Sequence, residues 1–98
     1  MNAPTLSKLQ ELKAEILHIA QKHGASNVLV FGSVARNEAT LESDLDFLVE
    51  LEPNRSLLDH AALVAELQEV LGYSVDVATV KGLKAGVRQH ILSEAVPL

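Results

Sequence analysis

Two aspartates stand where their carboxylates could bind a metal ion together. Asp44 and Asp46 are two residues apart at the start of an apolar stretch, Leu45 to Leu51, that predicts a strand. Residues i and i+2 of a strand point to the same face, so both carboxylates are expected to aim at one point. Carboxylates combined with substrate phosphates are the usual ligands of Mg²⁺. The alternative is a solvated acidic loop that precedes the strand.

A third aspartate, Asp76, lies inside another apolar stretch, Tyr73 to Val80, that also predicts a strand. A charged residue flanked by two valines in such a run needs an explanation. If this strand lies beside that of Asp46, the three carboxylates could hold two metal ions, one activating an attacking hydroxyl and the other supporting a triphosphate. The alternative is an edge strand on which Asp76 faces water.

A phosphate-binding turn is predicted at Gly32 and Ser33, which follow the short apolar strand Asn27 to Phe31 and precede a brief helix. Free backbone N–H groups and a hydroxyl at the positive end of a helix dipole favour phosphate. Gly32 would let the backbone approach a ligand closely. Arg36, about one turn further on, could reach the same anion or brace the next loop. A tight turn with a helix N-cap would also explain the Gly-Ser pair.

Longer helices must position these strands, and helical spacing of apolar residues predicts three of them. They run from about Thr5 to His23, from Ser56 to Leu71 and from Leu83 to Leu92. Ser56 and Asp59 form a capping-box pattern, and Gly24 and Gly72 close the first two helices. The apolar positions expected along the second and third helices are Leu57, Ala61, Val64 or Ala65, Leu67 or Gln68, Leu71, Val87 and Ile91. The alternating order predicts an α/β fold, a small mixed sheet of three to four strands packed against helices.

Composition narrows the function classes. With 98 residues, we expect a single domain spanning residues 1–98. The net charge of −5 opposes binding to nucleic acid, which depends on Lys and Arg, and suits a basic protein partner instead. The chain has no cysteine and no apolar run long enough to span a bilayer, and no secretory signal is visible. We therefore expect a soluble, cytoplasmic protein that does not enter a membrane.

Taken jointly, these residues resemble the signature of the DNA polymerase β-like nucleotidyltransferase superfamily, and within it the minimal nucleotidyltransferases (MNT). The matching motifs are Gly32-Ser33, Arg36, Ser43-Asp44-x-Asp46 and Asp76. One departure is Asn37, where the family usually has Gly after the Arg; Asn tolerates a left-handed backbone better than most residues. The resemblance covers nearly the whole chain and implies the nucleotidyltransferase fold.

The resemblance also implies a role for each residue of the signature. Gly32 and Ser33 would hold the triphosphate, Asp44 and Asp46 would bind Mg²⁺, Asp76 would complete the metal site and help deprotonate the acceptor, and Arg36 and Ser43 would support the loop between them. ATP is the expected co-substrate and Mg²⁺ the expected cofactor.

Minimal nucleotidyltransferases act as antitoxins that neutralise a HEPN-domain ribonuclease toxin, in some cases by transferring AMP onto a tyrosine of that toxin. The resemblance thus implies a protein adenylyltransferase that forms a hetero-oligomer with a HEPN toxin. Two other functions stay open. The chain could neutralise its partner by binding alone, or it could modify a small molecule such as an antibiotic, although it has no evident substrate domain for that.

Overall fold

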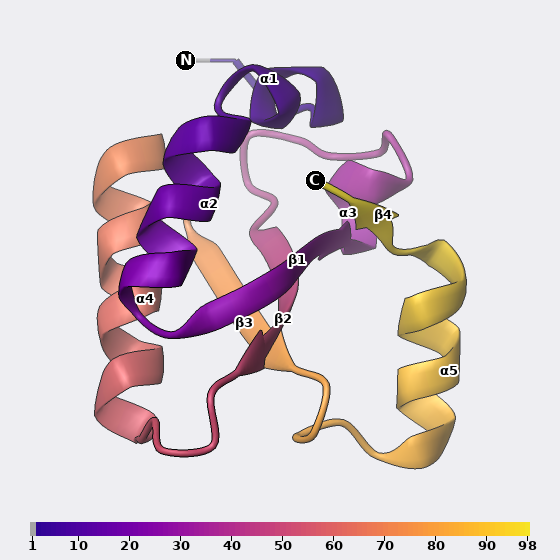
Figure 1. The fold of residues 1–98 in the computed structure, drawn as a ribbon. Helices are drawn as coiled ribbons and strands as arrows, with labels where there is room; N and C mark the ends of the chain where they lie inside the picture. Colours follow the sequence, from indigo (N-terminus) through magenta and orange to yellow (C-terminus); the bar gives the residue numbers. More distant parts are fainter. Residues whose placement is uncertain (1) are drawn as a thin grey trace.

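A four-stranded mixed sheet forms the centre of the computed structural model, which describes residues 2–98 (Figure 1). The strands are β1 (Ala25–Phe31), β2 (Leu45–Leu51), β3 (Val75–Thr79) and β4 (Val96–Pro97), in the order β3-β2-β1-β4. β1 is antiparallel to both β2 and β4, whereas β2 and β3 are parallel. The predicted α/β class and mixed sheet are confirmed.

Helices cover the two faces of the sheet unequally. α2 and α4 lie together on one side, and α5 lies alone on the other (Figure 1). The helices are α1 (Leu6–Glu11), α2 (Lys13–Lys22), α3 (Gly32–Ala35), α4 (Leu57–Leu71) and α5 (Ala85–Glu94). None of the helices among residues 2–98 has the length and apolar character needed to cross a bilayer.

The first predicted helix is in fact two helices. The backbone of Leu12 leaves the helical region, at φ −98° and ψ 11°, and separates α1 from α2. Leu9 and Ile16, on either side of this break, are each only 1% exposed. The change of direction therefore keeps both side chains in the core, which a sequence period alone does not reveal.

The predicted apolar positions of α4 and α5 are partly wrong. In α4, Leu57 is 83% exposed and Ala61 is also exposed, whereas Leu63 and Leu67 are the buried residues. Apolar residues occur around more than one side of this helix, so its period does not identify the side that packs. In α5, Val87 is exposed and Ile91 is buried.

Alternation along β2 separates a face that packs under α2 and α4 from a face that carries Asp46 and, next along it, the fully buried Leu48. On β2, Leu45, Phe47 and Val49 are at most 2% exposed and join the core beneath α2 and α4. Asp46, between them, points to the opposite face, as the two-residue period of a strand requires. We call this opposite side, which carries Asp46 and Asp76, the acidic face.

Candidate active site

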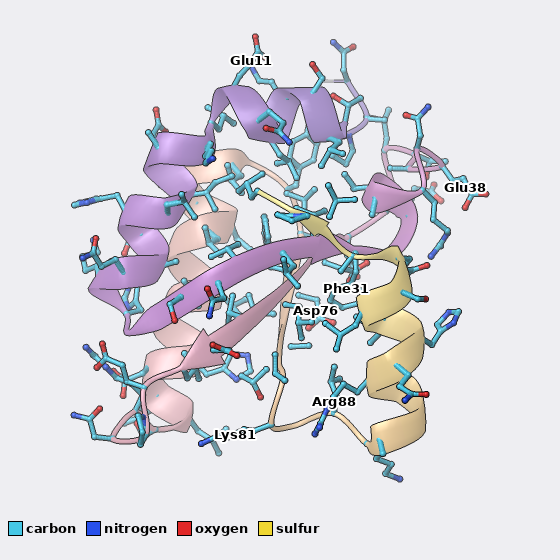
Figure 2. All side chains as sticks on the ribbon, turned by 45° about the vertical axis from the view of Figure 1, so that its right-hand side comes forward. Glu11, Phe31, Glu38, Asp76, Lys81 and Arg88 are labelled. Atoms are coloured by element: carbon cyan, nitrogen blue, oxygen red, sulfur yellow. The ribbon has the colours of Figure 1, made fainter. Side chains whose placement is uncertain are left out.

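One row of the sheet brings together residues from three strands. Phe31 of β1 is the partner of Asp46 in β2, and Asp46 is the partner of Asp76 in β3. Partners across neighbouring strands share a face of the sheet, so the two carboxylates are direct neighbours. Figure 2 shows Asp76 and Phe31 on the side of the sheet that α5 faces. The predicted proximity of the strands carrying Asp46 and Asp76 is thus present in the structure.

Asp76 faces water on an edge strand and also lies beside Asp46. β3 is an edge strand and Asp76 is exposed, as the simple explanation of a water-facing residue requires. The same residue is nevertheless beside Asp46, which is half-buried. An edge position leaves Asp76 accessible to a large acceptor molecule.

The electrostatics of this row are unfavourable without a cation. Burial, followed by repulsion from Asp76 and Asp44, raises the pKa of Asp46 to about 6, and the charge of Arg36 only partly opposes this. Asp44 precedes β2, and its charge still contributes to the raised pKa of Asp46. Uncompensated carboxylates of this kind fit a hard divalent cation with oxygen ligands.

The three carboxylates do not form a closed ligand set by themselves. Among residues 2–98, no three His, Cys, Asp or Glu side chains converge closely enough to hold a metal ion. Mg²⁺ in phosphate-transferring sites usually keeps only one or two protein carboxylates and takes its other ligands from substrate phosphates and water. The carboxylates present therefore fit Mg²⁺ as part of a site that a bound triphosphate would complete.

Gly32 directly follows this row and is required there for two reasons. Its φ of +75° lies in the left-handed region that disfavours residues with a Cβ. A Cβ at this position would also overlap the carboxylate of Asp46. The predicted close approach of the backbone at Gly32 is therefore made toward Asp46.

Side-chain hydrogen bonds hold the loop after α3. The Oγ of Ser43 accepts a hydrogen bond of 2.9 Å from the Thr40 N–H, which closes the turn before Asp44. The Arg36 Nε donates to Glu38 over 2.7 Å. Asn37 adopts a φ of +61°, so the departure from Gly is accommodated by the left-handed conformation expected of Asn.

Sequence reasoning missed one residue of this region, Glu94. Its carboxylate, from the last turn of α5, accepts hydrogen bonds from the Gly32 N–H over 3.1 Å and from Arg36 Nη1 over 3.1 and 3.2 Å. A negative charge in the last turn of a helix opposes the helix dipole. That unfavourable placement was the signal available in the sequence.

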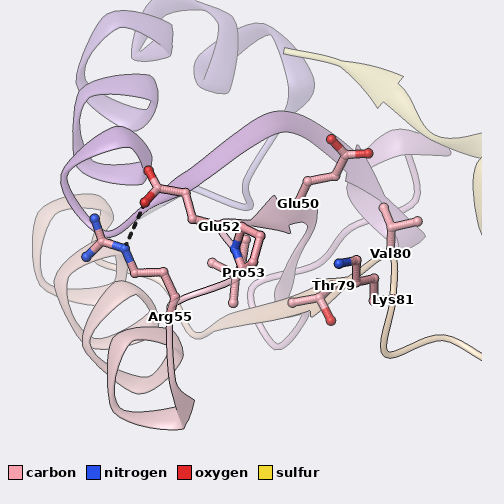
Figure 3. Close-up of a pocket in the computed structure, with 8 residues that line it drawn as sticks. Glu50, Glu52, Pro53, Arg55, Thr79, Val80 and Lys81 are labelled. Carbon is pink, nitrogen blue, oxygen red and sulfur yellow. Dashed lines mark hydrogen bonds and ion pairs between the residues drawn. The ribbon is translucent and has the colours of Figure 1, made fainter.

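A hollow on the described part of the chain is separate from the aspartates. It has a volume of about 590 Å³ and lies where β2 and β3 end, whereas Asp44, Asp46 and Asp76 lie where these strands begin (Figure 3). Arg55 in its wall is already paired with Glu52 over 3.3 Å. None of the predicted site residues lines this hollow, so the acidic face stays the better candidate.

Comparison with known proteins identifies the family of this chain. The family described as nucleotidyltransferase domain matches residues 9–98. The protein adenylyltransferase MntA of Thermococcus cleftensis is 36% identical over 93 residues, which are 94% of each chain. A solved structure assigned as a minimal nucleotidyltransferase is 45% identical, with a TM-score of 0.87 over 97% of both chains.

A more distant structure shares only the fold. A chain in the structure of the tri-AMPylated Shewanella oneidensis HEPN toxin in complex with MNT antitoxin has a TM-score of 0.69 at 16% identity, over 90% of this chain and 69% of that one. The expectation of a nucleotidyltransferase enzyme is confirmed by the family match and by the relatives at higher identity. This chain belongs to the nucleotidyltransferase domain family and has the fold of a minimal nucleotidyltransferase.

Proposed function

We propose that this chain transfers AMP from ATP to a hydroxyl group of a partner protein and thereby acts as the antitoxin of a toxin-antitoxin pair. The observation that carries the proposal is the position of Asp46, which is beside Asp76 in the sheet and against Gly32. The relative MntA, which bears the name protein adenylyltransferase, supports the choice of AMP and of a protein acceptor.

Each site residue has a role in this proposal. Gly32 and Ser33 hold the triphosphate, and Arg36 and Ser43 support them from the neighbouring loop. Asp44, Asp46 and Asp76 hold Mg²⁺, which when bound neutralises the phosphate charge and lowers the barrier to attack. This region carries four carboxylates, those of Asp44, Asp46, Asp76 and Glu94, and one guanidinium, that of Arg36. The excess of negative charge repels an anionic nucleotide, so the nucleotide needs such a cation to bind.

The reaction balances as a single displacement. The acceptor oxygen forms a bond to the α-phosphorus of ATP, and the bond from that phosphorus to the bridging oxygen of the β-phosphate breaks, so pyrophosphate leaves. The proton of the acceptor hydroxyl passes to the carboxylate of Asp76. Because Asp76 is exposed on an edge strand, a hydroxyl on the surface of another protein can approach it.

The partner in this proposal is a HEPN-domain toxin, and the acceptor is a tyrosine on it. Support comes from the shared fold with a chain in the complex of a tri-AMPylated HEPN toxin and an MNT antitoxin. The net charge of −5 also disfavours a nucleic acid as acceptor. The two proteins would form a hetero-oligomer.

A second candidate is an antitoxin that neutralises its partner by binding alone. The observation in its favour is that no three acidic, His or Cys side chains among residues 2–98 form a ready-made metal site. The two candidates differ in whether neutralisation needs the carboxylates.

The test is the intact mass of a candidate HEPN-domain partner protein after incubation with this chain, ATP and Mg²⁺. The mass of one or more AMP groups should be added by the wild-type chain and not by the Asp44→Ala/Asp46→Ala variant. Glu50→Gln serves as a matched control, because it removes a further acid of β2 while keeping the three aspartates. An unchanged partner mass in a tight complex would reject AMP transfer and favour neutralisation by binding.

A further inference from the structure

The carboxylate of Glu94 occupies the donors that the proposed nucleotide site would use. It accepts one hydrogen bond from the Gly32 N–H and two from Arg36 Nη1, at 3.1 to 3.2 Å. Its side chain is only 19% exposed, although α5 as a whole is a surface helix. Charge-assisted hydrogen bonds of this kind are the strong ones in proteins.

Glu94 is held there as an anion. Burial alone would raise the pKa of Glu94, but the hydrogen bonds from Gly32 and Arg36 outweigh burial and lower the pKa below its usual range. The Gly32 N–H and the Arg36 guanidinium therefore already stabilise one negative oxygen group beside Asp46. A phosphate oxygen presents the same charge and the same acceptor chemistry.

The Gly32 N–H cannot serve Glu94 and a phosphate together, and Nη1 of Arg36 is already engaged by Glu94. The Gly32 N–H can donate one hydrogen bond, and Glu94 accepts it. Arg36 has two of its nitrogens engaged, Nε by Glu38 and Nη1 by Glu94. A phosphate placed beside an unmoved Glu94 would also meet a like charge at close range, which is costly where water is partly excluded.

We propose that Glu94 is a residue of the nucleotide site. Its carboxylate accepts the hydrogen bonds of Gly32 and Arg36 that the triphosphate would accept, and it is displaced when the nucleotide binds. The proposal rests on the proposed function, because it takes the Gly32 and Arg36 region as the triphosphate site. It makes Glu94 an internal competitor whose removal strengthens nucleotide binding.

Displacement of Glu94 also loosens the last turn of α5. Ile91 is the buried residue of this helix, and Val87 and Leu92 are 49% and 44% exposed. Beyond the helix, β4 stays paired with β1 through Val96 and Val30. The contacts with Gly32 and Arg36 thus tie the end of α5 to the site, and nucleotide binding would exchange them for phosphate contacts.

The test is a calorimetric titration in the presence of Mg²⁺, with inorganic tripolyphosphate and, separately, with a non-hydrolysable ATP analogue. Glu94→Gln keeps the size of the side chain and removes its charge, and should bind both ligands about 10-fold more tightly than wild type, which corresponds to about 1.4 kcal/mol. Glu38→Gln is the matched control, since it removes the other carboxylate on Arg36 but leaves the Gly32 N–H in place. Its affinity should stay within about twofold of wild type.

The affinities of the two variants test the displacement of Glu94. Tighter binding by Glu94→Gln alone supports the proposal, because a purely structural role would weaken binding instead. Equal or weaker binding by Glu94→Gln, with a wild type that binds, overturns it and leaves the proposed function standing. If neither protein binds either ligand, the nucleotide site itself is refuted and the role of Glu94 with it.

A second measurement on the wild type covers the case of a variant that does not fold. Amide hydrogen exchange of residues 91–95 should become about 10-fold faster when the ATP analogue and Mg²⁺ are bound, since the anchor at Glu94 is lost. Slower exchange of these amides in the bound state would overturn the displacement of Glu94.

Discussion

The two faces of strand β2 use alternate residues for opposite purposes. Toward α2 and α4, Leu45, Phe47 and Val49 are almost fully removed from water. Toward the acidic face, burial and then repulsion from Asp76 and Asp44 raise the pKa of Asp46 to about 6. The packed face stabilises the fold, whereas the acidic face costs stability, and under the proposed function its charges bind a cation.

The first prediction breaks the packed face. Phe47→Ala should lower the free energy of unfolding by about 3–5 kcal/mol, because Phe47 is fully buried and a cavity would remain. Urea denaturation measures the change. Asp76→Asn, in the next strand on the acidic face, should change it by less than about 1 kcal/mol. Equal losses for the two variants would contradict the division between the faces.

The second prediction breaks the chemistry of the acidic face. Asp46→Asn should slow AMP transfer by roughly 100-fold or more, the usual loss when a group that stabilises the transition state is removed. The rate of mass increase of the partner protein gives the measurement. An unaltered rate in Asp46→Asn would remove this carboxylate from the site.

The third prediction concerns Gly32, which follows β1 and lies against Asp46. Gly32→Ala should destabilise the fold by about 1–2 kcal/mol, because Ala disfavours a φ of +75° and its Cβ would displace Asp46. Gly86→Ala is the control, since a Cβ there meets nothing within 4 Å and the residue is helical. It should raise stability by about 0.5–1 kcal/mol. Thermal melts that place both variants on the same side of wild type would be inconsistent with this reading.

The smallest effect sharpens the comparison through pH. The folded pKa of Asp46 exceeds its ordinary value of 3.8, so the folded state holds this proton more firmly, and stability is lost as pH rises from about 4 to about 6. In EDTA at pH 7, Asp46→Asn should therefore be about 1 kcal/mol more stable than wild type, a discounted figure because water still screens a half-buried carboxylate. The advantage should shrink toward pH 4. Melting curves in which it is constant with pH would point to another cause.

Sequence reasoning succeeded where the signal is local. The bounds of β2 are the predicted ones, the capping box of Ser56 and Asp59 is formed, and Gly72 has a left-handed φ of +76°. Each depends on a short pattern of residue types with one physical solution. The signature residues predicted for the site also lie within one short segment, apart from Asp76.

Features that depend on tertiary contacts were missed. The break between α1 and α2 at Leu12 and the exposure of Leu57 both depend on which side of a helix meets the sheet. The sequence did not identify that side, because these helices carry apolar residues on more than one side. The contact between Gly32 and Glu94 joins residues 62 positions apart. The unfavourable position of Glu94 at the end of a helix was visible, but its partner was not.

The parallel pairing of Asp46 with Asp76 has a consequence for how the chain folds. These residues meet only after the whole connection through α4 has closed between β2 and β3, and such nonlocal pairings form slowly because loop closure costs entropy. Repulsion between the two carboxylates is thereby postponed until the packing of α4 is already contributing stability. During synthesis, a chain that has emerged only as far as β2 cannot yet place Asp76 beside Asp46, so the row of carboxylates is completed only when β3 joins the sheet.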